Sequence, residues 1–161
     1  MTTNKWKEIV DKLIANNITI ATMESCTGGG IANEITNISG ASSILHESYV
    51  TYCNEAKIKQ GVPAEIIEKY TVYSTETAEA MAKAVKEKAK TDIGIGVTGQ
   101  LGRIDPNNPV DKLNHVWFAI AKSNGKIIVK ELTVPENNRA IQKEFIIFEI
   151  GNVLVENIWW N

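Results

Sequence analysis

The sequence has little of what marks disulfide-rich, metal-binding or membrane proteins. Its two cysteines, Cys26 and Cys53, are too few for a disulfide scaffold, and with only two histidines their spacing does not indicate a zinc site. No apolar run is long enough to span a bilayer. Residues 1–8 lack the basic-then-apolar pattern of a signal peptide. We therefore expect a cytoplasmic protein that does not bind membranes.

An excess of charge of either sign is also missing. The 17 Lys and Arg residues balance 19 Asp and Glu residues, which gives a formal net charge of −2 at pH 7. This balance provides no general attraction to nucleic acid or anionic lipid, so neither is an expected partner. Hydrophobic residues make up 43% of the 161 residues, which excludes disorder and suits a single domain over residues 1–161.

The spacing of apolar residues predicts helices and strands in alternation. Helices are predicted at 5–16, from Ile31 to Ile35, from Asn54 to Gly61, and at 63–70, 75–90 and 137–158. Strands are predicted at 18–23, 49–53, 92–97, 115–121 and 126–134. A long loop covers residues 99–114, and Ser123–Gly125 forms a hairpin turn. This order predicts an α/β fold, a three-layer α/β/α sandwich with a mixed, mostly parallel sheet.

The segment Met23-Glu-Ser-Cys-Thr-Gly-Gly-Gly30 joins the first predicted strand to a helix. Backbone N–H groups at a helix start are unpaired, and the helix dipole adds a positive field there. Two interpretations stay open: a tight turn capped by a hydroxyl side chain, or a cradle for an anion or oxyanion. The segment matches neither the dinucleotide-binding motif, nor the P-loop, nor the nucleophile elbow of serine hydrolases.

If Ser25 is a nucleophile, it needs a base. His46 and His115 are expected to be structural or surface residues, and a lysine is the other known base for a serine. Lys57 lies in the first turn of the helix that we expect Asn54 to cap, where the helix dipole disfavours a cation. Lys57 is therefore either a solvated side chain near Glu55 or a neutral amine that accepts a proton.

The second interpretation requires a large change in the pKa of Lys57. Lowering the pKa of a lysine from about 10.4 to about 7 takes roughly 4.6 kcal/mol, whereas a helix terminus supplies only about 0.3–1 kcal/mol. Desolvation must supply most of the difference, assisted by a second cation. Arg139 is a candidate for that cation or for an anion clamp, and the alternative is an arginine on the surface of the last helix.

Two segments together resemble the signature blocks of the CinA C-terminal-domain family. They are Glu24-Ser-Cys-Thr-Gly-Gly29 and Tyr49-Val-Thr-Tyr-Cys-Asn-Glu-Ala-Lys57. The segments Gly96-Val-Thr-Gly99 and Val116-Trp-Phe-Ala119 agree with two lesser blocks, so the resemblance covers nearly the whole chain. The family includes stand-alone nicotinamide-nucleotide amidohydrolases, while its competence-associated members carry an additional N-terminal domain.

The resemblance implies deamidation of nicotinamide mononucleotide to nicotinate mononucleotide and ammonia. By motif position, Ser25 matches the nucleophile and Lys57 its base, while Tyr52, Thr98 and Arg139 match positions near the site. The resemblance thus implies Ser25, Lys57 and Tyr52 as the catalytic residues. Ser25 would attack the carboxamide carbon, and water would then hydrolyse the acyl-enzyme. The resemblance implies no metal and no redox cofactor.

The expected substrate-binding residues come from the glycine-containing segments and from two arginines. Backbone N–H groups around Cys26 and Thr27 hold the oxyanion, or the glycines hold a phosphate, and the sequence leaves both open. The predicted substrate-binding set is Cys26, Thr27, Gly28, Gly29, Thr98, Gly99, Arg103 and Arg139.

The chain departs from the family pattern in the predicted loop. It reads Gly102-Arg-Ile-Asp-Pro-Asn-Asn-Pro109 where the family usually has Gly-Pro-x-Gly-Gly. The missing glycines remove positions where a phosphate approaches the backbone closely, and Arg103 is either a charge-assisted replacement or a solvated loop residue. Cys53 stands where the family commonly has serine, and we expect it to be a small buried packing residue.

Two other functions remain open alongside the hydrolase. One is a catalytically degenerate nucleotide-binding or adaptor module, and the other is a related amidase with a different amide substrate. The expected partners are a small-molecule nucleotide and further copies of the chain in a homo-oligomer. The terminal Ile158-Trp-Trp-Asn161 either packs on the chain's own core or joins a subunit contact.

Overall fold

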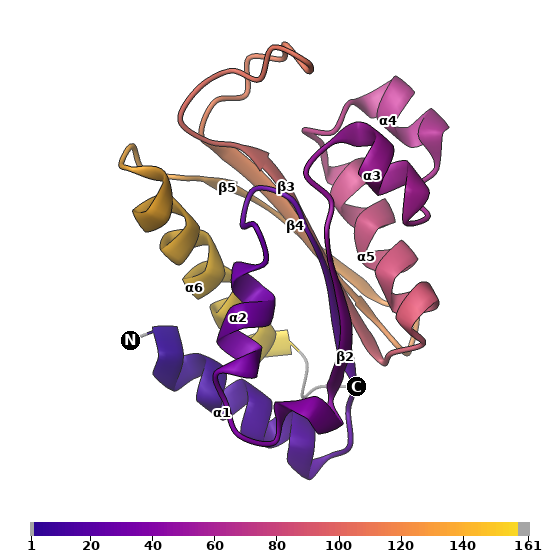
Figure 1. Cartoon of the computed structure of the whole chain (residues 1–161), viewed down its shortest axis with the longest axis vertical. Coiled ribbons are helices and arrows are strands. Elements are labelled where there is room, and N and C mark those ends of the chain that lie inside the picture. Colours follow the sequence, from indigo (N-terminus) through magenta and orange to yellow (C-terminus); the bar gives the residue numbers. More distant parts are fainter. Residues whose placement is uncertain (1, 158–161) are drawn as a thin grey trace.

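The computed structural model describes residues 2–157, with side chains from residue 4 onward. A five-stranded sheet lies between two layers of helices (Figure 1). The elements are α1 (Thr2–Ala15), β1 (Ile20–Glu24), α2 (Gly30–Thr36), the 3-10 helix η1 (Ala41–Ser43), β2 (Leu45–Val50), α3 (Asn54–Lys59), α4 (Ala64–Tyr70), α5 (Thr75–Ala89), β3 (Ile93–Gln100), β4 (His115–Lys122), β5 (Ile127–Thr133) and α6 (Arg139–Asn157). The predicted α/β class is therefore confirmed.

The sheet is mixed, in the strand order β2-β1-β3-β4-β5. Strands β2, β1 and β3 are parallel to one another, whereas β4 is antiparallel to both of its neighbours. Four of the five strands therefore run in the same direction, although two of the four pairings are antiparallel. The predicted hairpin turn at Ser123–Gly125 joins β4 to β5, and the Gly125 N–H bonds to the Lys122 carbonyl oxygen at 3.1 Å.

The two helical layers cover opposite faces of the sheet, with α1, α2 and α6 on one face and α3, α4 and α5 on the other (Figure 1). Side chains alternate along β3, so Ile95 and Val97 enter the core beneath the first layer. Gly94 and Gly96 face α5, where an added Cβ would overlap carbonyl oxygens of that helix. The alternating glycines therefore allow α5 to pack against the sheet at backbone distance.

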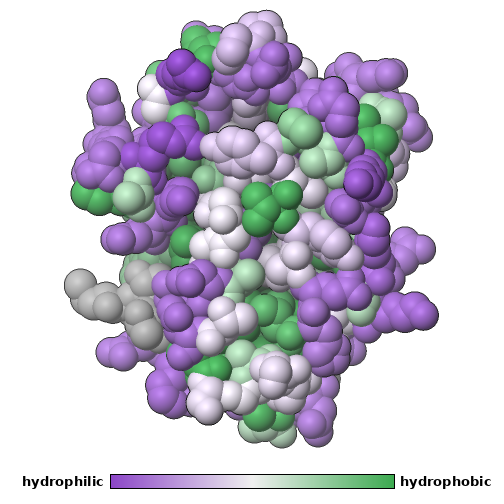
Figure 2. Space-filling model, in the orientation of Figure 1, coloured by the Kyte–Doolittle hydropathy of each residue, from purple (hydrophilic) through white to green (hydrophobic). Residues whose placement is uncertain are grey.

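The surface is largely hydrophilic at the periphery of the face drawn in Figure 2. Apolar residues gather in a narrow band down the middle of that face, between the two helical layers. Val50 and Tyr52, at the end of the edge strand β2 and just beyond it, are exposed to 55% and 62%. Among residues 2–157, no helix is long and apolar enough to cross a membrane.

Several predicted boundaries are wrong because contacts distant in sequence decide them. β2 ends at Val50 rather than at Cys53, and β3 continues to Gln100 because Gly99 and Gln100 still pair with β4. The N-cap of α3 is Cys53, whose backbone is extended, and not Asn54, whose amide bonds to Asn108 instead. The terminal residues 158–161, where we expected an aromatic contact, lie outside the described residues.

Candidate active site

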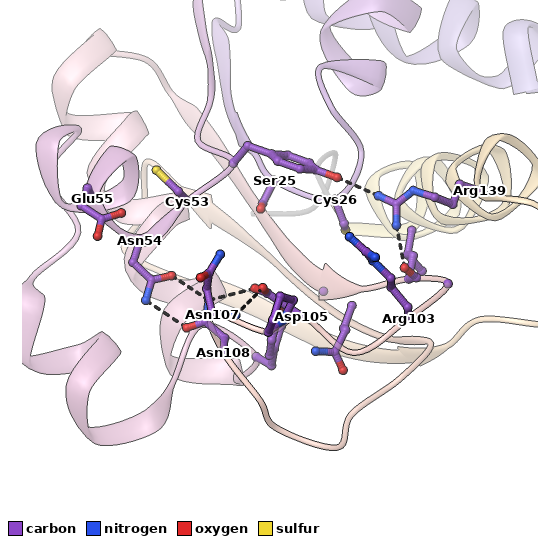
Figure 3. Close-up of a pocket in the computed structure, with 17 residues that line it drawn as sticks. Ser25, Cys26, Cys53, Asn54, Glu55, Arg103, Asp105, Asn107, Asn108 and Arg139 are labelled. Atoms are coloured by element: carbon purple, nitrogen blue, oxygen red, sulfur yellow. Dashed lines mark hydrogen bonds between the residues drawn. The ribbon is translucent and has the colours of Figure 1, made fainter.

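A pocket of about 1000 Å³ opens where the turn after β1, the β2–α3 connection and the loop after β3 meet. These segments follow the carboxyl ends of parallel strands, the usual place for ligand sites in α/β folds. Figure 3 shows Arg103 and Arg139 on one side of the pocket and Asn54 and Asn108 on the other, with Ser25 between them. The pocket therefore has a cationic side and an amide-rich side.

Ser25 and Lys57 meet at the wall of this pocket, as predicted. The Ser25 N–H donates to the Val97 carbonyl oxygen at 3.0 Å, which fixes Ser25 beside β3. The Lys57 amine donates to Ser25 Oγ at 3.2 Å and to the Thr51 carbonyl oxygen at 2.9 Å. Ser25 lines the pocket, while Lys57 is only 2% exposed. The serine hydroxyl therefore lies between a buried amine and the space open to a ligand.

Burial is the main cause of the altered acidity of Lys57. It lowers the pKa of the amine from an ordinary value of 10.5 to about 8, and nearby Cys26, Cys53 and Asp105 partly oppose the change. The expectation that desolvation dominates is therefore confirmed. Arg139, the expected assisting cation, is not among the groups that shift the pKa of Lys57; its guanidinium donates to the Leu101 carbonyl oxygen at 2.6 Å and to the Tyr52 hydroxyl at 2.7 Å.

Glu24 is the residue of this turn whose role the sequence analysis missed. Its carboxylate is buried and accepts hydrogen bonds from the backbone N–H groups of Ile31 and Ala32 at 2.9 and 3.0 Å. It also accepts from the hydroxyls of Thr27 and Thr22 at 2.7 and 3.0 Å. The start of α2 is thus satisfied by the protein's own anion, which leaves those two N–H groups unavailable to a ligand. The sequence pattern that could have indicated this role is an acidic residue between Thr22 and Thr27, just before the glycines that begin α2.

The predicted cradle is therefore only partly present. Thr27 turns its side chain to Glu24, while Gly28 and Gly29 adopt φ angles of 60° and 90° and shape the turn without lining the pocket. Cys26 does line the pocket, and burial raises the pKa of its thiol to about 12. The backbone N–H groups of Cys26 and Thr27 donate to no oxygen or nitrogen acceptor within the described part of the chain.

The other predicted positions divide between pocket and core. Tyr52, Arg103 and Arg139 line the pocket, and Arg103 forms no hydrogen bond or ion pair with any other described residue. Gly99 also lines the pocket, although contact with β4 already explains a glycine there, since an added Cβ would overlap that strand. Thr98, in contrast, is buried, donates to the Val72 carbonyl oxygen at 2.7 Å and does not line the pocket.

Cys53 is not the buried packing residue that we expected. It is exposed and lines the pocket, because the chain leaves the sheet before Cys53 and the residue caps α3 with an extended backbone. His46 is exposed, and His115 bonds to Glu131 at 3.1 Å on the surface, so neither histidine lines the pocket. No group of three or more metal-ligating side chains occurs among the residues that the structure describes.

The loop after β3 is anchored in its middle and at its far end. Asn54 and Asn108 exchange two side-chain hydrogen bonds of 2.9 and 3.2 Å, and Asp105 accepts one from the Tyr73 hydroxyl at 2.9 Å. At the far end, Asn114 Oδ1 accepts from the Gln142 amide at 3.0 Å. The sequence analysis missed these residues, although the turn-forming Asp-Pro-Asn-Asn run offered a local signal.

Comparison with known proteins gives consistent matches. The model of the CinA C-terminal domain matches residues 2–153. A putative competence-damage inducible protein of Acetivibrio thermocellus is 44% identical over 133 residues, which cover 81% of this chain and 31% of that protein. A protein of the same description from Clostridium botulinum (strain ATCC 19397 / Type A) is 40% identical over 135 residues, or 83% and 32% of the two chains. The chain thus spans about a third of the length of these curated relatives.

Solved structures match over almost the full length. The competence damage-inducible protein A of Klebsiella pneumoniae subsp. pneumoniae MGH 78578 superposes with a TM-score of 0.90 at 25% identity, covering 99% of both chains. The competence/damage inducible protein CihA of Agrobacterium tumefaciens gives a TM-score of 0.87 at 25% identity and covers 96% of this chain and 94% of its own. The three-layer arrangement is therefore shared with these proteins.

Proposed function

The chain belongs to the CinA C-terminal domain family, and from this premise we propose that it is an amidohydrolase that converts nicotinamide mononucleotide to nicotinate mononucleotide and ammonia. The observation that carries the proposal is the 3.2 Å contact between the Lys57 amine and Ser25 Oγ at the pocket wall. A serine beside a buried lysine of lowered pKa is a nucleophile with its base.

The reaction begins with the neutral form of Lys57. Its amine accepts the hydroxyl proton as Ser25 Oγ attacks the carboxamide carbon, and the oxyanion of the tetrahedral intermediate takes hydrogen bonds from backbone N–H groups at Cys26 and Thr27. The protonated Lys57 then passes its proton to the departing amine, which leaves as ammonia. Water attacks the resulting ester, Lys57 again serves as base and acid, and Ser25 Oγ is released with the carboxylic acid product.

The cationic side of the pocket suits the phosphate of a mononucleotide. Arg103 is free to form a charge-assisted contact, and Arg139 is held by Tyr52 and the Leu101 carbonyl oxygen with its guanidinium at the pocket. The volume of about 1000 Å³ is at the upper end of the range typical for small-molecule sites, roughly 300–1000 Å³. In this proposal Arg103 replaces the close backbone contacts of the glycine-rich family loop.

A second candidate is an amidase of the same mechanism with another amide substrate. The observation that favours it is the loop of residues 101–114, where Asp105 and Asn108 bond to Tyr73 and Asn54 in place of the glycine-rich family segment. This loop lines the pocket opposite the candidate nucleophile, so its sequence directly affects which substrate fits.

Ammonia release from nicotinamide mononucleotide tests the proposal. We expect turnover by the wild type and at least a thousandfold loss in both Ser25→Ala and Lys57→Met. Matched controls are Ser43→Ala and Lys59→Met, which alter an exposed serine and an exposed lysine outside the pocket and should keep full activity. Turnover of other amides alone would support the second candidate, and binding without any turnover would indicate a nucleotide-binding module and refute the hydrolase.

A further inference from the structure

Gln100 is a buried amide at the wall of the pocket whose two polar atoms make no hydrogen bond of good geometry with the described residues. It ends β3, is 3% exposed and lines the pocket. Neither its Oε1 nor its Nε2 forms a hydrogen bond with any residue in the described range 2–157. Buried polar groups in folded proteins are nearly always paired, so an amide left unpaired at a pocket wall indicates a group that binds there.

The position of Gln100 relates it to Ser25. Glu24 pairs with Val97 in the parallel ladder, so Ser25 lies level with Thr98, two residues before Gln100. Side chains two residues apart on a strand point to the same face, and the strand advances on the order of 7 Å over that interval. Gln100 therefore lies farther along the pocket than Ser25, on the sheet face that is covered by α3, the helix of Lys57. A ligand whose amide carbon lies at Ser25 Oγ extends toward Gln100.

The neighbours of Gln100 define the kind of group that binds. The amide lies close enough to the Tyr73 hydroxyl to favour ionisation of that phenol, although the two groups do not reach hydrogen-bond geometry, and the hydroxyl itself donates to the Asp105 carboxylate at 2.9 Å. A glutamine amide offers a donor and an acceptor side by side, and a carboxylate adds a further acceptor. Two adjacent hydroxyl groups, each able to donate and accept, complement this set. A carboxamide is a poorer match, because its oxygen must face the N–H groups at Cys26 and Thr27 for the proposed reaction.

We propose that Gln100 is a specificity-determining residue that binds the ribose hydroxyls of a pyridine nucleotide. The inference rests on the proposed function for the orientation of the ligand, with the carboxamide at Ser25 and the phosphate toward Arg103 and Arg139. Gln100 then binds the ribose, which lies between the carboxamide and the phosphate of the nucleotide. The ribose hydroxyls would supply the hydrogen-bond partners that the Gln100 amide lacks in the free protein.

The test replaces Gln100 with methionine, which has the same length and no amide. Because the substitution removes an unsatisfied buried polar group, we expect the Tm of the free protein to rise by about 2–4 °C. We also expect KM for nicotinamide mononucleotide to rise at least tenfold while kcat changes less than threefold. The wild type should discriminate at least tenfold against the 2′-deoxy and 3′-deoxy analogues, and Gln100→Met should not. Gln60→Met, outside the pocket, is the matched control and should retain the discrimination.

Calorimetric titration of Ser25→Ala with nicotinate mononucleotide and its deoxy analogues separates this inference from the proposed function. Selective binding of the ribose form without any turnover by the wild type would refute the hydrolase and support the Gln100 subsite. Equal binding of ribose and deoxy forms, or a Gln100→Met protein with lower Tm and unchanged discrimination, would refute the subsite and show that Gln100 is structural. Failure of every nucleotide to bind, together with no turnover by the wild type, would refute both.

Discussion

The buried amine of Lys57 makes a prediction about stability that does not depend on any substrate. In the unfolded chain this lysine has an ordinary pKa of 10.5, whereas in the folded protein burial lowers the pKa to about 8. Below pH 8 both states carry the proton, and the folded protein bears the full unfavourable effect of a buried ammonium. Between pH 8 and 10.5 the folded protein releases that proton first, so its stability rises with pH.

The size of the effect follows from the two pKa values. Their difference corresponds to roughly 3 kcal/mol in total, of which roughly 2 kcal/mol is gained between pH 7 and pH 9.5. Lys57→Met has nearly the same shape and no titrating group, so it lacks this contribution. The free energy of unfolding of the wild type, measured relative to Lys57→Met, should therefore increase by roughly 2 kcal/mol over that range.

Urea denaturation of both proteins at half-unit steps from pH 6.5 to 9.5 measures this difference, in which the titration of all other groups cancels. Lys59→Met supplies the control, because Lys59 is exposed on the same helix and its removal should give no pH-dependent difference. A flat difference for Lys57→Met, or one that decreases with pH, would contradict a buried amine of lowered pKa. If the wild type hydrolyses amides, kcat/KM should also rise tenfold per pH unit below about pH 8 and level off above it.

Three further predictions concern the turn, the sheet and the cationic side of the pocket. Glu24→Gln should lower the free energy of unfolding by about 2–4 kcal/mol in urea denaturation, because its buried carboxylate accepts four hydrogen bonds. Gly96→Ala should cost about 3 kcal/mol or more by the same measurement, because an added Cβ overlaps α5, whereas Gly125→Ala should cost only about 1 kcal/mol at an open turn. Arg139→Lys should raise KM for nicotinamide mononucleotide about tenfold in steady-state kinetics, because a lysine cannot hold both present contacts and a phosphate.

Each of these has an outcome that counts against it. Equal stability of Glu24→Gln and of a variant at the exposed Glu55 would mean that α2 does not depend on the buried carboxylate. A Gly96→Ala protein as stable as Gly125→Ala would show that α5 can shift away from the sheet. If Arg139→Lys affects nicotinamide riboside, which has no phosphate, as strongly as the nucleotide, then Arg139 does not act on the phosphate.

The local pattern of the sequence was sufficient for most of the architecture. Period-two and period-3.6 spacing placed the strands and helices, and the glycines of β3 correctly marked a strand rather than a loop. The pairing of Ser25 with Lys57 was predicted from the position of Lys57 in a helix start and from the family resemblance, and the structure explains it, because both residues lie in segments that follow neighbouring parallel strands.

What could not be predicted depends on register between distant segments. The contact of Asn54 with Asn108 joins residues 54 positions apart, and it explains why Asn54 does not cap α3. Thr98 was assigned to the site because it matches a family position there, whereas pairing with β4 carries β3 past it and its buried hydroxyl bonds to Val72. To predict the role of Glu24, one must know how close the start of α2 lies to the end of β1, and no local sequence pattern gives that distance.

The loop of residues 101–114 is held in place independently of Ser25 and Lys57, so the residues that select the substrate are separate from those that react with it. Its middle is held by the Asn54–Asn108 contact and its far end by the Asn114–Gln142 contact, and neither contact involves Ser25 or Lys57. The loop residues between these two contacts can be exchanged for others while Ser25 and Lys57 keep their positions. Grafting loops from relatives onto this fold is therefore a direct route to new substrate preferences.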